Sequence, residues 1–83
     1  MASQAQIRSF DAPGIYLILV QGALREDAPY LDDLTITAQY SEQGAPVTLL
    51  SGTLTDQAAL MGVLTALYNR GITVLAVNRV ASA

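Results

Sequence analysis

The fold is decided by residues 47–77, which read VTLLSGTLTDQAALMGVLTALYNRGITVLAV. The stretch begins with a strand pattern at residues 47–52, changes to a helical period after Thr55, and ends in an unbroken apolar run at residues 72–77. Thr55 is predicted to be the N-cap of the helix, and Gly71 the residue that follows its last turn. Because a strand, a helix and a strand follow one another, the last strand is predicted to run parallel to the strand at residues 47–52.

The predicted helix has two unlike faces. The stripe that should pack on a sheet consists of Ala59, Leu60, Val63, Leu64 and Leu67. The opposite side carries Met61, Thr65 and Tyr68 instead of the Glu and Lys residues of a solvated helix. Since Met and Tyr are favoured in interface cores, these three residues are predicted to form a contact between subunits. The alternative is an exposed helix that contacts nothing.

Two more strands are predicted before this stretch. Residues 15–20 (IYLILV) are apolar on both faces, and residues 34–40 (LTITAQY) alternate as in a half-exposed strand. In the return strand, Val47 and Leu49 are expected to point inward and Thr48 outward. The predicted fold is therefore α+β, with element order β-β-β-α-β, a four-stranded sheet in the order 4-1-2-3 and one helix packed on one face.

One helix leaves the other face of such a sheet uncovered. An apolar patch is predicted there, which would be a second contact between copies: Tyr16, Ile18 and Val20 beside either Thr73, Leu75 and Val77 or the alternate residues of the last strand. The alternative is that the N-terminal segment covers the patch through Ile7 and Phe10. The strand at residues 47–52 is also expected to be an edge without charges, open to pairing with another chain.

The domain organisation follows from the chain length of 83 residues, which supports one core. Residues 1–13 are predicted to be a flexible N-terminal arm, residues 14–80 a single α+β domain and residues 81–83 a C-terminal tail.

The composition points to self-association. The chain is 52% hydrophobic and 13% charged, and it contains no lysine. Asp56 is the single charged residue in residues 43–69. Because an isolated domain normally carries about a quarter charged residues, we interpret the chain as one copy of a homo-oligomer.

The same composition excludes several kinds of chemistry. There is no cysteine and no histidine, so disulfides, common zinc sites and imidazole catalysis are excluded, and we expect neither an enzyme nor a cofactor or metal. A cluster of acids is read as a solvated loop, because its spacing fits no known cation site: Glu26, Asp27, Asp32 and Asp33. The net charge of −3 argues against a nucleic acid as partner. No secretory signal or membrane span is evident, so a cytoplasmic location is expected.

Three motifs carry a resemblance to a known group. They are YLILVQG at residues 16–22, DQAALMG at residues 56–62 and Gly71 after the helix. Over about residues 15–78 the sequence resembles a group of small uncharacterised bacterial proteins whose helix usually begins DQAALHG. Met61 stands where that group has histidine. The group has no established activity, so the resemblance implies a fold and no reaction.

The sequence thus predicts a self-assembling structural or interaction protein, a ring, a dimer, or a tube or filament, built through apolar helix and sheet faces. The alternative is a small binding module for an apolar ligand or a partner's segment, with Tyr16 and Tyr68 as aromatic anchors.

Overall fold

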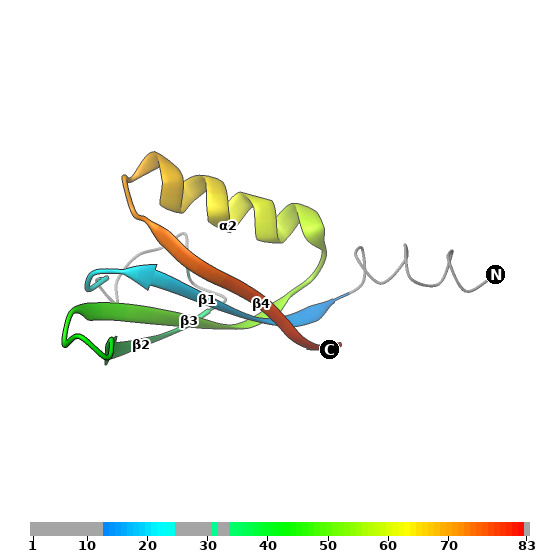
Figure 1. Ribbon diagram of the computed structural model, residues 1–83. Helices are drawn as coiled ribbons and strands as arrows, with labels where there is room; N and C mark the ends of the chain where they lie inside the picture. The colour runs from blue at the N-terminus through cyan, green and yellow to red at the C-terminus, as the bar shows by residue number, and fades with distance from the viewer. Residues whose placement is uncertain (1–12, 25–30, 32–33, 83) are drawn as a thin grey trace.

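The computed structural model of the chain describes residues 13–24, 31 and 34–82. In these residues one helix lies over one face of a four-stranded antiparallel sheet, which confirms the predicted α+β class (Figure 1). Apart from Pro13, the predicted N-terminal arm falls outside the described residues.

The elements follow along the chain in the predicted sequence of types: β1 (Gly14–Gln21), β2 (Thr35–Tyr40), β3 (Pro46–Leu54), α2 (Gln57–Asn69) and β4 (Val74–Ser82). Across the sheet the order is β2-β3-β1-β4, and every neighbouring pair is antiparallel. As predicted, β4 lies beside β1 and runs parallel to β3, so β3, α2 and β4 form a split βαβ unit with β1 between its strands. Because β4 continues to Ser82, two residues predicted as a tail belong to the last strand.

The strand order differs from the predicted 4-1-2-3 by one exchange. Read from β4 it is 4-1-3-2, because β3 and not β2 pairs with β1. The physical reason is that β3 is apolar on both faces, through Val47 and Leu49 on one and Leu50 and Leu54 on the other, whereas one face of β2 is polar. The strand predicted to be an edge is therefore internal, and β2 and β4 are the edges among the described strands.

Both ends of the helix are capped by hydrogen bonds to its terminal backbone groups. Asp56, not the predicted Thr55, is the N-cap: its backbone is extended and its Oδ1 accepts a hydrogen bond of 2.8 Å from the Ala59 amide. At the other end Gly71 has φ +74°, as predicted for the residue after the C-cap. The Gly71 amide donates to the Tyr68 carbonyl and the Ile72 amide to the Leu67 carbonyl, a Schellman motif that turns the chain toward β4.

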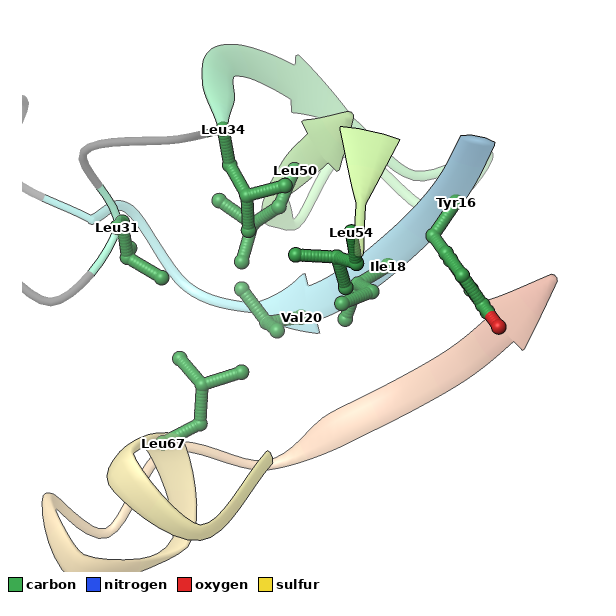
Figure 2. Packing of buried hydrophobic residues seen from close by; sticks show 8 residues of the cluster. All are labelled: Tyr16, Ile18, Val20, Leu31, Leu34, Leu50, Leu54 and Leu67. Carbon is green, nitrogen blue, oxygen red and sulfur yellow. The ribbon is translucent and has the colours of Figure 1, made fainter. Parts of the chain in front are cut away.

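The core lies between α2 and the sheet. Figure 2 shows Leu67 pointing from the helix toward Val20, with Ile18, Leu50 and Leu54 on the strands beyond. The other members of the predicted helical stripe pack against this cluster partly buried: Ala59, Leu60, Val63 and Leu64. The predicted inward face of the helix is thus confirmed.

Thr48 corrects the predicted orientation of β3. Thr48 was expected to point outward and Val47 and Leu49 inward, but Thr48 is buried on the helix side, opposite Val20, and the other two point to the opposite face. The Thr48 Oγ1 donates to the Gly22 carbonyl at 2.8 Å and accepts from the Leu24 amide at 3.1 Å. The hydroxyl can be buried because both of these bonds satisfy it, and they fix the chain where it leaves β1.

The N-cap assignment is tested by two alanine variants. Asp56→Ala removes the bond to the Ala59 amide and should lower the free energy of unfolding by about 1 kcal/mol, measured by urea denaturation. Thr55→Ala is the matched control and should change it by less than half of that. A larger loss in the Thr55 variant would contradict the assignment.

Candidate interaction surfaces

The described residues offer surfaces rather than a reactive centre. No group of three or more His, Cys, Asp or Glu side chains gathers in this part of the chain. The acidic residues of the predicted solvated loop, at positions 26, 27, 32 and 33, lie outside the described residues. The described residues present four surface features: a sheet face without a helix, the outer side of α2, a groove beside β4 and the edges of the sheet.

The sheet face that points away from α2, here called the open face, follows from the strand register. Residues paired across an antiparallel sheet point to the same side, and Leu17, Leu19 and their partners alternate with the buried residues of β1. The open face comprises Ile15, Leu17, Leu19 and Gln21 of β1, Val47, Leu49, Ser51 and Thr53 of β3, Thr35, Thr37 and Gln39 of β2, and Ala76, Asn78 and Ala81 of β4. Figure 1 shows α2 on the other side of the sheet.

The centre of the open face is apolar. Leu19 lies between Leu49 of β3 and Ala76 of β4, and all three are half-buried by their neighbours in the sheet. Val47 lies between Gln21 and Gln39 and is only 7% exposed. The rim, toward β2 and the end of β4, is built from Thr, Gln and Asn side chains, so the face has an apolar centre and a neutral polar border.

No charged side chain belongs to the open face. The described residues contain four charged groups, and each is placed elsewhere: Glu42, Asp56, Arg70 and Arg79. Glu42 is in the β2–β3 turn, Asp56 and Arg70 cap the two ends of α2, and Arg79 pairs with Tyr16 on the helix side. The charged side chains of the described residues therefore contribute no ionic solvation to this face.

The prediction that Tyr16, Ile18 and Val20 lie on the uncovered face is wrong. All three are buried in the core beneath α2. Because β1 is apolar at every position from Ile15 to Val20, its sequence does not tell which set faces the helix. The residues of β1 that do lie on the open face are Ile15, Leu17 and Leu19. The alternating pattern of β2 could have indicated this, because its apolar residue Ile36 pairs with Leu50 and marks the core side of β3.

The outer side of α2 is exposed as predicted. Met61 is 51% exposed and Tyr68 80% exposed, and Thr65 lies on the same side. These side chains have the composition of an interface core, but their role as a subunit contact stays a prediction.

A groove runs between the end of α2 and β4. It has a volume of about 550 Å³ and is lined by Leu64, Tyr68, Gly71, Ile72, Thr73, Val74 and Val77. Val77 pairs with Ile18 and so points to the helix side, which places it in the groove and not on the open face where it was predicted. Leu75, predicted in the same patch, is exposed beside an irregularity in the β1–β4 register. Their role as contact residues is untested.

None of the described helices is long and apolar enough to cross a membrane.

The described residues form a small α+β domain. One face of its antiparallel sheet is covered by a helix, and the other is neutral and partly apolar. No cluster of possible metal ligands is found in this part of the chain. The chain belongs to a family described as a domain of unknown function, DUF8691, whose model matches residues 15–78. Neither curated proteins nor solved structures gave a match. The family match covers the range of the resemblance seen in the sequence, whereas the bacterial origin and the shared helix motif stay predictions.

Proposed function

We propose that the protein is a self-assembling structural protein whose copies pack against one another through the open face. The observation that carries the proposal is the absence of charge from that face, across all four strands, with Leu17, Leu19 and Leu49 at its centre. Among the described residues nothing lies over these side chains in a single copy, because α2 covers only the other side of the sheet.

The composition of the open face suits a contact with an identical copy. In a two-fold contact each patch meets its own copy, so a charge near the axis would lie beside the same charge of the partner, and a charge elsewhere would meet a neutral surface that cannot pair with it. A neutral face avoids this repulsion. Two sheets that pack face to face lie about 10 Å apart and interdigitate their side chains, which would convert two half-covered sheets into a sandwich.

Further contacts would decide the size of the particle. A face-to-face contact alone closes a dimer, whereas an additional contact through Met61 and Tyr68 would link dimers into a ring, a tube or a filament. The proposal assigns no catalysis, no cofactor and no nucleic acid to the chain, and its partner is a second copy.

A charge introduced on the open face tests the proposal. Light scattering at protein concentrations of about 1 mM, where a dimer stabilised by about 4 kcal/mol forms, should give the natural protein a mass above the 8.8 kDa of one chain. Leu17→Glu should lower that mass, because burying an unpaired carboxylate in the contact costs several kcal/mol. Far-UV circular dichroism should be unchanged, since the residue faces away from the core.

The control is Ala45→Glu, which adds the same charge in the exposed β2–β3 turn and should leave the mass as it is. A natural protein of 8.8 kDa would sink the proposal. So would a Leu17 variant with the mass of the natural protein.

A binding module for a small apolar molecule is the second candidate, and the groove beside β4 favours it. Its volume of about 550 Å³ lies within the range of roughly 300–1,000 Å³ that is typical of ligand sites, and no charged residue lines it. Tyr68, predicted as an aromatic anchor, forms part of its wall. Tyr16, the other predicted anchor, is buried in the core and is not part of the groove.

The uncharged dye Nile red tests this second candidate. If the groove binds apolar molecules, Tyr68→Ala should weaken dye binding roughly 5-fold, because an aromatic contact contributes about 1 kcal/mol. Tyr40→Ala removes an equally exposed tyrosine from β2, outside the groove, and should have no effect. Equal effects of the two substitutions would show that the dye does not bind in this groove.

A further inference from the structure

The free edge of β2 has a defined set of unpaired backbone groups. β2 pairs with β3 on one side and forms the outer strand of the described sheet. Its register with β3 runs without a shift from Thr35 opposite Ser51 to Tyr40 opposite Pro46. In an antiparallel pair the residues alternate between those that exchange hydrogen bonds with the neighbour and those whose amide and carbonyl point away from it.

Pro46 shows at which residues of β2 the backbone amide and carbonyl point away from β3. It has no amide hydrogen, and its carbonyl accepts a bond from the Gly22 amide on the β1 side. Tyr40, opposite Pro46, therefore exchanges no bonds with β3. The bond from the Ser41 amide to the Ala45 carbonyl, one position further into the turn, fits the same alternation. By the period of two, the amides and carbonyls of Ile36, Ala38 and Tyr40 point away from β3.

This edge carries none of the features that usually prevent pairing. β2 contains no charged residue, no proline and no bulge. The other edge, β4, has two register shifts against β1. β4 also carries Arg79, whose guanidinium bends back to donate to the Pro13 carbonyl at 3.3 Å. Bulges disturb the row of edge groups, so β2 is the edge better suited to accept another strand.

We propose that β2 pairs antiparallel with β2 of a second copy about a two-fold axis at Ala38. In this register Ala38 faces Ala38 of the second copy, and Ile36 faces Tyr40 of the second copy. Each of these facing pairs exchanges two hydrogen bonds, so every outward group of the three residues is satisfied. The two sheets join into one, with β2 of each copy at the centre.

The side chains fit this register. Tyr40, 77% exposed in the single chain, gains a β-branched neighbour in Ile36 of the second copy, and such cross-strand pairs contribute to sheet stability. Ala38 on the axis is small, so two copies of it meet without a clash. On the open face the pairs are Thr37 with Gln39 and Thr35 with Ser41, all neutral. The joined sheets continue the open face, so this contact rests on the proposed self-assembly and extends it.

Cysteine cross-linking tests the register, because the natural chain has no cysteine. In Ala38→Cys the two Cα atoms on the axis would lie about 5.5 Å apart, within the range of about 4.4–6.8 Å that a disulfide spans. Mild oxidation should give a covalent dimer. The control is Thr35→Cys. In this register position 35 faces Ser41 of the second copy, which is six residues, or roughly 20 Å, along the strand from position 35 of that copy. The two cysteines are therefore too far apart for a disulfide, and this variant should cross-link at least 10-fold more slowly.

Amide hydrogen exchange on the natural protein provides a second measurement that needs no variant. The amides of Ile36, Ala38 and Tyr40 should exchange more slowly as the protein concentration rises. Equal cross-linking at positions 35 and 38, or exchange at these amides that is independent of concentration in particles heavier than one chain, would overturn the edge contact alone. A natural protein that stays at 8.8 kDa would overturn both this contact and the proposed function.

Discussion

In the described part of the chain a single helix covers one face of a four-stranded sheet, and none of the four charged side chains found there lies on the other face. α2 has 13 residues and lies across the side of the sheet where the core cluster gathers. The charges that the described residues do contain serve other purposes, with Asp56 capping the helix and Arg79 bending back toward Pro13. What is left for the second face is Leu, Ile, Val, Thr and Gln.

Magnitudes indicate how strong a contact through this face alone would be. Full burial of a Leu or Ile side chain contributes about 1.5–3 kcal/mol, and those on the open face keep at most about a third of their surface exposed, so each would gain at most roughly 0.5–1 kcal/mol. Four such side chains from each of two copies, Ile15, Leu17, Leu19 and Leu49, give at most roughly 4–8 kcal/mol, against an association cost of about 4–15 kcal/mol. The face alone therefore suits a weak dimer. Hydrogen bonds at the β2 edge, or a contact through Met61 and Tyr68, would be needed for a tight assembly.

The elements with strong local signals could be predicted from the sequence. The helical period, Gly71 after the last turn and the parallel course of the strands on either side of the helix all follow from local pattern and chain connectivity. The N-cap was shifted by one residue because Thr55 and Asp56 are both good caps, and only the backbone angles of Asp56 distinguish them.

The orientation and order of the strands were harder to predict, because β1 and β3 are apolar on both faces. A period of two is invisible in IYLILV, so the sequence did not tell whether Tyr16, Ile18 and Val20 or the alternate residues meet the helix. The burial of Thr48 could not be predicted either, because its hydroxyl forms hydrogen bonds with backbone groups of Gly22 and Leu24, which are distant in the sequence. Among the described residues one sheet face carries no helix, and its residues are not the set that was predicted from the sequence.

The most direct measurement is the solvent accessibility of leucine methyl groups, read by NMR relaxation from a dissolved nitroxide at several protein concentrations. If a second copy covers the open face, the methyls of Leu17, Leu19 and Leu49 are shielded at high protein concentration and become accessible on dilution. The methyls of Leu67, in the core, should stay shielded throughout. Strong and equal relaxation of the open-face methyls at every concentration would contradict the claim that a second copy covers this face.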